Sequence, residues 1–198
     1  MESYNVGSRI SDEDIFLFNE GSHFRLYEKL GARQVKQEGS AGTHFAVWAP
    51  NANHVSVIGE FNKWNKGKHR LHPKGQSGIW EGFIPAIGKG TLYKYHIGSR
   101  FNGYRADKAD PFSIFNEIPP KFASIVWDLD YQWHDDDWMA TRRQRNGLDK
   151  PMAIYEMHVG SWRRIIEEGN RSLSYRELAS QLADYLENMA YTHVEFLP

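Results

Sequence analysis

The stretch HFAVWAPNANHVSVIGE, residues 44–60, holds two short runs of β-branched and aromatic residues separated by a turn rich in proline and asparagine. Two further runs of the same kind follow, IWEGFIP at residues 79–85 and LYKYHIG at residues 92–98. β-Branched and aromatic side chains favour strands, whereas Pro, Gly and Asn favour the turns between them. Because no helical periodicity separates these runs, they predict an antiparallel β-sandwich.

The sequence on either side of these strands sets the expected limits of the sandwich. The stretch DIFLFNEGSHFRLYEKLGA, which begins at Asp14, has apolar residues at helical spacing and predicts a short helix that ends at Gly31. On the far side, three prolines precede one more strand-like run at residues 124–127. We therefore predict an N-terminal helical segment over residues 1–36 and the sandwich over residues 37–128.

A different pattern begins near residue 151. Residues 129–150 are polar and rich in turn-forming residues, and are predicted to be a linker. The next stretch, MAIYEMHV, is a nearly continuous apolar run, typical of a strand buried on both faces. Ser174 and Glu177 then match a capping box at the start of an amphipathic helix, and the strand-like THVEFLP follows that helix. Residues 151–198 therefore predict a βαβ unit with parallel strands.

Composition limits the partners that this chain would bind. The 198 residues include 24 basic and 25 acidic side chains and no cysteine. This balance gives no electrostatic footprint for nucleic acid, and the absence of cysteine fits a reducing, cytoplasmic location. No apolar run approaches the roughly 18 residues of a membrane span. We expect a soluble, cytoplasmic protein with a neutral partner, and neither nucleic acid nor a membrane among its partners.

Motifs for metals, cofactors and hydrolytic nucleophiles give no match. The acidic stretch at residues 128–138 lacks the glycine and glutamate positions of a calcium-binding loop. His69 and His72 lie in a loop with no third ligand nearby. No glycine-rich phosphate loop, GxSxG elbow or HExxH motif occurs. The sequence therefore predicts no metal site and no cofactor.

Four side chains of the predicted sandwich are candidates for ligand binding. Trp64 has only polar neighbours in the loop GEFNKWN, so its ring either stacks on a sugar or folds back over the sandwich. Alternation in LYKYHIG places Lys94 and His96 on the wetter face of a strand. Phe101 follows that strand, and Trp80 is the fourth candidate, with packing beside the core as its competing interpretation.

Three residues of the predicted βαβ unit are also of interest. His158 lies near the end of the first strand, where the active sites of parallel barrels are found, although a structural role is an equal alternative. Trp162 follows that strand and would line a pocket or cover the rim of the sheet. Glu156 lies inside the same apolar run, where a charge buried on both faces would need a partner.

Several motifs together carry a resemblance to a known family. HFAVWAPNANHVSVIGEFNKWN, KADPF, IYEMHVGSWRR and SYRELASQLADYLENMAYTHVEFLP resemble, in this order, the N-terminal part of the 1,4-α-glucan branching enzymes of the α-amylase family. The resemblance implies a mainly β chain with a short N-terminal helix. An immunoglobulin-like β-sandwich, a carbohydrate-binding module of the glycogen-binding type, would be followed by the first βαβ unit of a (β/α)8 TIM barrel.

The resemblance also implies an activity for the complete enzyme. Members of this family transfer a segment of α-1,4-glucan to a 6-hydroxyl by a retaining double displacement, which needs two carboxyl groups about 5 Å apart. The catalytic acids of the family lie on later barrel strands and match no position among the 198 residues. We therefore assign no catalytic residue, and we expect this chain to be a fragment that is inactive without the remainder of the catalytic barrel.

Substrate-binding residues carry over one by one. The stacking tryptophan of the family's FNxW loop matches Trp64, and the lysine of its YKY strand matches Lys94. A second stacking tryptophan would fall near Phe101, and the family's glycine after the barrel helix is replaced by Ala190. The implied partner is an α-1,4-glucan such as glycogen or amylose.

Two other functions remain alternatives. One is a different α-amylase-family enzyme, such as a debranching hydrolase, and the other is a non-catalytic glucan-binding protein. A further alternative concerns the sandwich itself, which would either bind glucan or only brace the barrel.

Overall fold

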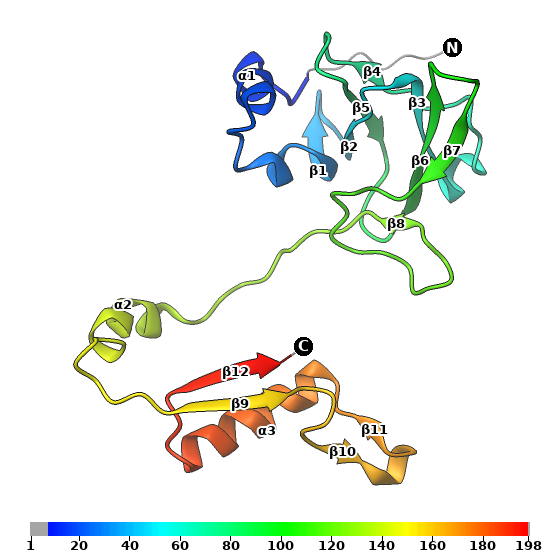
Figure 1. The fold of residues 1–198 in the computed structure, drawn as a ribbon. Coiled ribbons are helices and arrows are strands. Elements are labelled where there is room, and N and C mark those ends of the chain that lie inside the picture. Colours follow the sequence, from blue (N-terminus) through cyan, green and yellow to red (C-terminus); the bar gives the residue numbers. More distant parts are fainter. Residues whose placement is uncertain (1–7, 198) are drawn as a thin grey trace. The chain divides into compact units, whose positions relative to one another are not determined.

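The structure is a computed structural model that describes residues 8–197. Contacts divide the chain into two compact units, one up to Tyr131 and one from Gln132 onwards (Figure 1). Each unit is described by itself. Residues 1–7 of the predicted N-terminal helical segment lie outside the described part.

The first unit contains two antiparallel sheets, which confirms the predicted sandwich. One sheet has the order β1-β2-β5-β4, and the other has the order β3-β6-β7, with β8 also pairing with β6. All four strand-like runs from the sequence are strands in the structure, within β2, β3, β5 and β6. The strands are β1 (Gly31–Gln37), β2 (Ser40–Trp48), β3 (Ala52–Gly59), β4 (His72–Pro73), β5 (Ile79–Pro85), β6 (Leu92–Ser99), β7 (Arg105–Lys108) and β8 (Ser124–Ile125).

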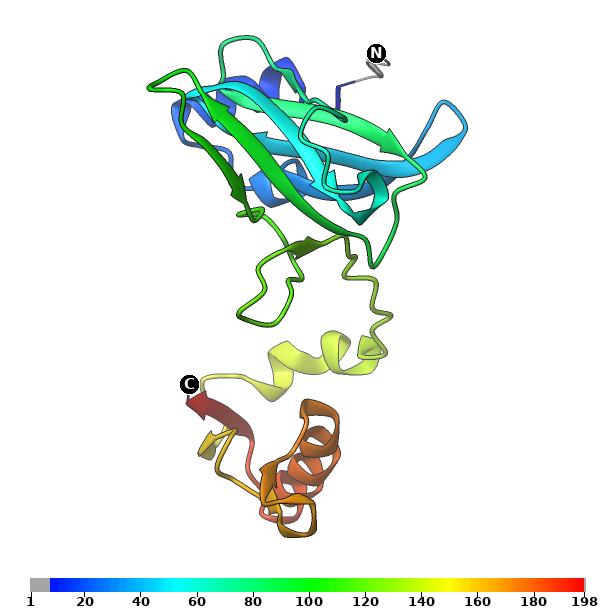
Figure 2. The ribbon, with the colours of Figure 1, turned by 90° about the vertical axis from the view of Figure 1, so that its right-hand side faces the viewer.

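The main hydrophobic core lies between the two sheets, which face each other in Figures 1 and 2. Alternation along β2 and β6 buries Phe45, Tyr93 and Tyr95, and the rings of Phe45 and Tyr93 meet edge to face with centroids 5.1 Å apart. The hydroxyls of Tyr93 and Tyr95 donate to Oδ2 of the buried Asp110, at 2.6 and 3.1 Å. Their buried polar atoms are therefore paired, as a close-packed core requires.

The N-terminal helix differs from the prediction. Helix α1 (Asp12–Glu20) ends ten residues before Gly31, at Gly21, which has a left-handed φ of 74°. Ser11 and Asp14 form a capping box that starts it, and the later apolar residues form only the single 3-10 turn η1 (Leu26–Glu28). The prediction of one helix ending at Gly31 was therefore wrong, because the earlier glycine already supplies the stop.

The segment from residue 31 is also a strand and not part of the helical segment. β1 pairs with β2 along its full length, from Gly31 opposite Ala46 to Gln37 opposite Ser40. Its sequence, GARQVKQ, is polar because it is an edge strand with one wet face. The sandwich therefore begins before residue 37.

The N-terminal segment packs against the sheet β1-β2-β5-β4. Ile10 and Leu30 are buried against Ala46 and Ile79, on the opposite side of β2 from Phe45. Under the same segment, Nε2 of the buried His44 lies 2.9 Å from Oε2 of Glu81, which also accepts hydrogen bonds from Ser8 and the backbone of Arg9.

The second unit contains the predicted βαβ arrangement. Strand β9 (Ile154–His158), helix α3 (Tyr175–Asn188) and strand β12 (His193–Leu197) follow in order, and β12 pairs in parallel with β9. The predicted capping box at Ser174 and Glu177 starts α3. Between β9 and α3 lie β10 (Arg164–Ile165), η3 (Ile166–Glu168) and β11 (Arg171–Ser172). Met157 packs against Leu178 and Leu182 of α3, so this face of the sheet forms the core of the unit.

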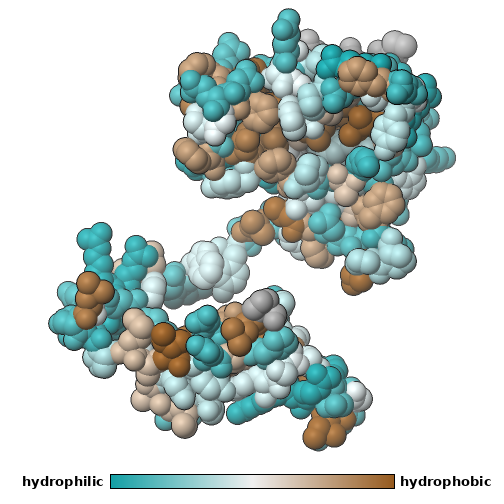
Figure 3. All heavy atoms as spheres, viewed as in Figure 1, coloured by the Kyte–Doolittle hydropathy of each residue, from teal (hydrophilic) through white to brown (hydrophobic). Residues whose placement is uncertain are grey.

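One prediction for the second unit was wrong, and one helix there was not predicted. The predicted linker contains helix α2 (Asp136–Arg145), which buries none of its side chains and carries acidic residues in its first turn and arginines in its last. Strand β9 is buried on one face only, because Ile154, Glu156 and His158 are exposed on the face opposite α3. Glu156 lies next to Glu195 of β12 on that open face, where brown apolar and teal hydrophilic surface alternate in Figure 3.

Candidate functional site

The loop after β3 is held in place by a buried asparagine. After β3 the chain makes the 3-10 turn η2 (Glu60–Asn62), and Oδ1 of Asn62 accepts a hydrogen bond from the backbone N–H of Gly59 at 3.1 Å. Its Nδ2 donates to the carbonyl of Val57 at 3.0 Å and lies 2.9 Å from Nδ1 of His69. Phe61 packs against the core from the same turn. The first two residues of the FNxW motif therefore fix the loop.

Trp64 is presented at the tip of this turn in an unusual conformation. Lys63 and Trp64 both have left-handed φ angles, 54° and 56°, which are outliers for bulky side chains. The backbone N–H of Trp64 donates to the carbonyl of Gly59 at 2.8 Å, which holds the bend. The side chain is 36% exposed, so its ring neither enters the core nor extends fully into water.

Lys94 of β6 joins Trp64 to a third residue. Its Nζ lies 5.2 Å from the centroid of a Trp64 ring and 3.5 Å from that of Phe122. Both distances are within the range of a cation–π contact. Among residues 8–197, no carboxylate forms an ion pair with Lys94. The group formed by Trp64, Lys94 and Phe122 is called the aromatic–lysine cluster below.

Phe122 could not have been found from its own sequence context. It follows the adjacent Pro119 and Pro120 in a loop without strand or helix periodicity, and is 52% exposed. The pairing of β8 with the start of β6 brings this loop to Lys94, since Leu92 lies opposite Ile125. A pairing between strands about 30 residues apart has no local signal in the sequence.

An ionic bridge ties the Trp64 loop across the same sheet. Nζ of Lys66 lies 3.2 Å from Oδ2 of Asp107 on β7, and Nδ1 of His96 lies 2.6 Å from the other carboxylate oxygen. Burial raises the pKa of Asp107, but hydrogen bonds from His96 and Lys66 outweigh it and hold this pKa below its ordinary value. His96 is buried, so its predicted place on the wetter face was wrong, because its ring packs against His54 and its ion-pair partner Asp107.

The other two candidates of the sandwich lie elsewhere. Lys94 sits near the start of β6, whereas Phe101 lies just past its end, seven residues later and on the order of 20 Å away at the rise of an extended strand. Trp80 belongs to β5 in the other sheet, where it packs beside the core and its Nε1 donates to the carbonyl of Ala49 at 3.1 Å. The structure therefore brings Trp64 and Lys94 together, and places Phe101 and Trp80 apart from them.

The candidates in the second unit also separate. His158 lines a cavity of about 670 Å³ together with Tyr175 at the start of α3 and Leu197 at the end of β12. Trp162 instead packs in the core, where its Nε1 donates to the hydroxyl of Tyr155 at 3.0 Å and its ring meets that of Tyr185. Trp162 is therefore not among the residues that line the cavity at His158.

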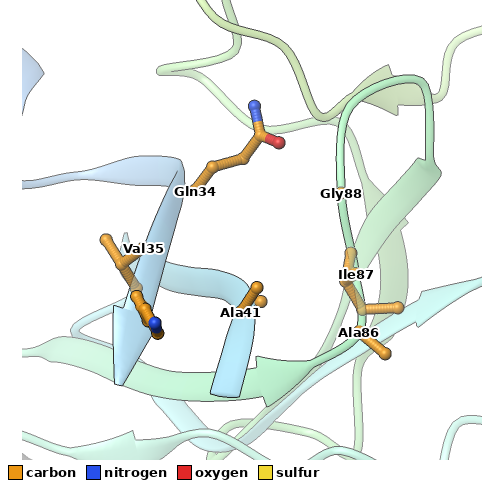
Figure 4. Close-up of a pocket in the computed structure, with 8 residues that line it drawn as sticks. Gln34, Val35, Ala41, Ala86, Ile87 and Gly88 are labelled. Carbon is orange, nitrogen blue, oxygen red and sulfur yellow. The ribbon is translucent and has the colours of Figure 1, made fainter. Parts of the chain in front are cut away.

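A third concave region lies at the edge of the sandwich. A cavity of about 440 Å³ opens beside Gln34, Val35 and Ala41, with Ala86 and Ile87 on its far side (Figure 4). The Gln34 amide already accepts from the backbone of Lys89 and donates to Asp128. The remaining lining is mostly aliphatic or backbone, so this cavity offers few polar groups for orienting a ligand.

The side chains of the aromatic–lysine cluster have the chemistry of a binding site. Within residues 8–197, no group of three or more His, Asp or Glu side chains is placed to hold a metal ion. No helix in the described part is long and apolar enough to cross a membrane. The aromatic–lysine cluster offers exposed ring surface beside three ammonium donors, which suits a ligand that is apolar on one side and rich in hydroxyls on its edges.

Comparison with known proteins agrees with this arrangement. The family model of carbohydrate-binding module 48, described as the isoamylase N-terminal domain, matches residues 29–113. The chain is 52% identical over 192 residues to the 1,4-alpha-glucan branching enzyme GlgB of Aquifex aeolicus. The aligned region covers 96% of this chain and 30% of that protein. It is 48% identical over 198 residues to the enzyme of the same name from Paramagnetospirillum magneticum, of which it covers 27%.

Solved structures show the same fold. A pullulanase of Klebsiella pneumoniae, complexed with maltotriose, superposes with a TM-score of 0.58 at 22% identity, over 85% of this chain and 17% of that one. The pullulanase of Bacillus acidopullulyticus gives a TM-score of 0.57 at 20% identity, over 85% of this chain and 21% of that one. At this identity the likeness concerns the fold alone.

The chain spans about 30% of the length of the curated relatives that it matches. Residues 29–113 match the family model of carbohydrate-binding module 48, and the chain over nearly its whole length matches the N-terminal part of 1,4-alpha-glucan branching enzymes.

Proposed function

We propose that the sandwich binds α-1,4-glucan through the aromatic–lysine cluster. The observation that carries this proposal is the position of Lys94, whose ammonium group lies within cation–π distance of two exposed rings, those of Trp64 and Phe122. A sugar ring has an apolar face that stacks on an aromatic ring, and hydroxyls on its edges that accept hydrogen bonds from an ammonium group. The Trp64 ring for stacking and the Lys94 ammonium group for hydrogen bonding lie 5.2 Å apart, close enough to contact the same sugar ring.

The loop geometry supports the same function. Asn62 and the ion pair between Lys66 and Asp107 hold the Trp64 loop on both sides of the tryptophan. The loop therefore loses little conformational freedom when a ligand binds. Such preorganisation raises affinity by lowering the entropic cost of binding. The near-zero net charge of the chain suits a neutral polysaccharide.

We further propose that the complete protein is a cytoplasmic 1,4-α-glucan branching enzyme. The support is the identity to branching enzymes over the whole chain and the parallel strands β9 and β12 with α3 on one face. We propose that these elements are the first βαβ unit of a (β/α)8 barrel, with His158 at the carboxyl end of its first strand. The transfer would proceed by retaining double displacement on carboxyl groups outside residues 1–198, to which no residue of this chain is assigned.

Co-sedimentation with glycogen tests the binding proposal. The 198-residue chain is expected to sediment with glycogen, and Trp64→Ala is expected to weaken this binding roughly tenfold or more, as for other buried aromatic contacts in interfaces. Lys94→Met and Phe122→Ala are expected to weaken it as well, since each removes one side of the cluster.

Phe24→Ala is the matched control, because Phe24 is an exposed aromatic residue of the same unit, in a different loop. Its retention should equal that of the wild type. Equal retention of Trp64→Ala, Lys94→Met and the wild type would show that the cluster does not bind glucan, and the sandwich would then act only as a brace.

A further inference from the structure

A further cavity lies at the opposite end of the sandwich from the aromatic–lysine cluster. The register of β3 and β6 places Gly59 opposite Tyr93 near the cluster, and Ala52 opposite Ser99 at the other end. The cavity, of about 420 Å³, opens at this other end, where β3 and β5 start and β4 and β6 finish. Arg100, which lines the cavity, follows Lys94 by six residues, on the order of 20 Å along an extended strand.

The lining of this cavity combines one aromatic ring with planar polar side chains. Trp80 contributes indole surface, Arg100 a guanidinium group, and Asn53 and Gln76 side-chain amides. The volume is in the range of small-molecule sites, and a few convergent polar groups around an aromatic surface are the usual composition of such sites. No carboxylate lines the cavity, so it is unsuited to a cation.

The two most important side chains are already held in position. Nε1 of Trp80 donates to Ala49, so the indole is fixed beside the core with its polar atom satisfied. The backbone N–H of Arg100 donates to the carbonyl of Asn51 at 2.9 Å, and its guanidinium donates to the carbonyl of Pro50 on the cavity rim. A guanidinium has five N–H donors, which leaves several for a ligand.

The turn between β4 and β5 forms a fixed wall. Gly78 has a left-handed φ of 79°, and a Cβ atom there would lie 2.8 Å from the Cα of Pro50 and 3.0 Å from Nε1 of Trp48. Only glycine therefore allows this turn to approach the turn before β3 so closely. Gly75, also left-handed, lines the same wall.

We propose that this cavity is a second binding site for a neutral oligosaccharide, a short α-1,4-glucan, with Trp80 as its ring surface and Arg100 and Gln76 as its hydrogen-bonding groups. Phe101 lies beside it, with its ring centroid 5.7 Å from the guanidinium carbon of Arg100, and extends the ring surface at the rim. This proposal rests on the proposed function, since it assigns the same ligand class to the second end of the module. A glucan chain would thus meet the sandwich at two separate points, which raises the apparent affinity for a long polymer.

Titration of the 198-residue chain with maltoheptaose, by calorimetry and by amide chemical shifts, tests the second site. In the wild type we expect two separate groups of shifted amides, one around Trp64 and one around Gly75 and Gly78. Trp64→Ala should remove only the first group. In the Trp64→Ala background, Arg100→Ala should weaken the remaining binding roughly tenfold or more, because it removes charge-assisted hydrogen bonds.

Arg25→Ala in the same background is the matched control, because Arg25 is an exposed arginine of the N-terminal segment that is paired with Glu28. It should leave the remaining binding unchanged. Added sodium sulfate should not displace maltoheptaose, and displacement would show that Arg100 holds an anion instead. If Trp64→Ala alone abolishes all binding, the second site is overturned and the proposed function stands. If the wild type does not bind maltoheptaose at all, both the second site and glucan binding by the aromatic–lysine cluster are contradicted.

Discussion

Asn62 decides at the residue scale how Trp64 is presented. Two consecutive left-handed residues, Lys63 and Trp64, are costly for L-amino acids, by about 1–2 kcal/mol each. The three hydrogen-bonding contacts of the Asn62 side chain, to Gly59, Val57 and His69, offset part of this cost. The exposed ring therefore depends on a buried amide two positions earlier.

Replacing this amide gives a test of its role. Asn62→Ala should lower the free energy of unfolding by about 1–3 kcal/mol, because it leaves buried backbone groups without partners. Urea denaturation measures this change. Asn65→Ala is the matched control, since Asn65 lies in the same loop but is exposed and contacts only the backbone of Gly67. Similar losses in both variants would contradict the assignment.

At this scale the sequence identified two of the three residues of the aromatic–lysine cluster. Trp64 was recognisable because a tryptophan with polar neighbours is unusual, and Lys94 because alternation in β6 turned it away from the buried tyrosines. Phe122 was not recognisable, since only the pairing of β8 with β6 places its loop beside Lys94. Phe101 follows β6, as predicted, but the extended strand places it far from Lys94, because closeness in sequence is not closeness in space along a strand.

At the scale of secondary-structure elements, the N-terminal segment is held on the sheet by residues far from it in the sequence. The N-terminal segment covers a buried pair, His44 and Glu81, and contributes Ser8 and Arg9 to it. Burial raises the pKa of Glu81, but hydrogen bonds from His44 and Ser8 outweigh burial and hold this pKa below the ordinary value of 4.5. The ionised carboxylate therefore stabilises the packing of this segment on the sheet.

This pair predicts a pH dependence with a defined sign. Below about pH 4.5 the unfolded state binds more protons at Glu81 than the folded state, so the free energy of unfolding should fall as the pH falls. Glu81→Gln should be less stable than the wild type at neutral pH and should lose less on acidification. Urea midpoints measured across this range, with exposed Glu38→Gln as the control, test it. An equally steep decline in Glu81→Gln would contradict the account.

Helix α3 ends in a Schellman motif that lacks its usual glycine. The backbone N–H of Tyr191 donates to the carbonyl of Leu186 at 3.0 Å, and that of Ala190 to Glu187 at 3.1 Å, while Ala190 has a left-handed φ of 59°. The expected left-handed position at Ala190 is therefore confirmed. Alanine there costs roughly 1 kcal/mol relative to glycine.

Ala190→Gly should stabilise the end of α3 by about 1 kcal/mol, which corresponds to roughly fivefold slower hydrogen exchange in its last turn. Ala183→Gly is the matched control within the same helix. This substitution should destabilise the helix by about 1 kcal/mol, because glycine in a helix interior is unfavourable. Faster exchange in Ala190→Gly would show that the cap is not strained.

The elements that sequence analysis missed share a physical cause. β1 and α2 are polar on most of their surface, so the hydrophobic period that identifies an element is weak in both. Strand β1 is formed by pairing with β2, and α2 by charges matched to its ends. The four central strands of the sandwich and the βαβ unit were predictable because their apolar residues carry a clear period or a clear cap.

At the scale of the whole molecule, the two units differ in the surfaces that they expose. The sandwich has ring surface and hydrogen-bond donors at both ends of β6, where we propose that glucan binds. The βαβ unit has one face of its sheet covered by α3 and one face open. The two units together form the region that aligns with about 30% of the length of a 1,4-alpha-glucan branching enzyme.

The central claim, that Trp64 stacks on glucan, is tested most directly by its own indole N–H signal. We expect this signal, assigned by its loss in Trp64→Phe, to shift saturably as maltoheptaose is added to the 198-residue chain. The indole signal of Trp162, which is half-buried in the second unit and donates to the hydroxyl of Tyr155, should stay unchanged. A Trp64 signal that does not move while maltoheptaose binds elsewhere on the chain would contradict the account.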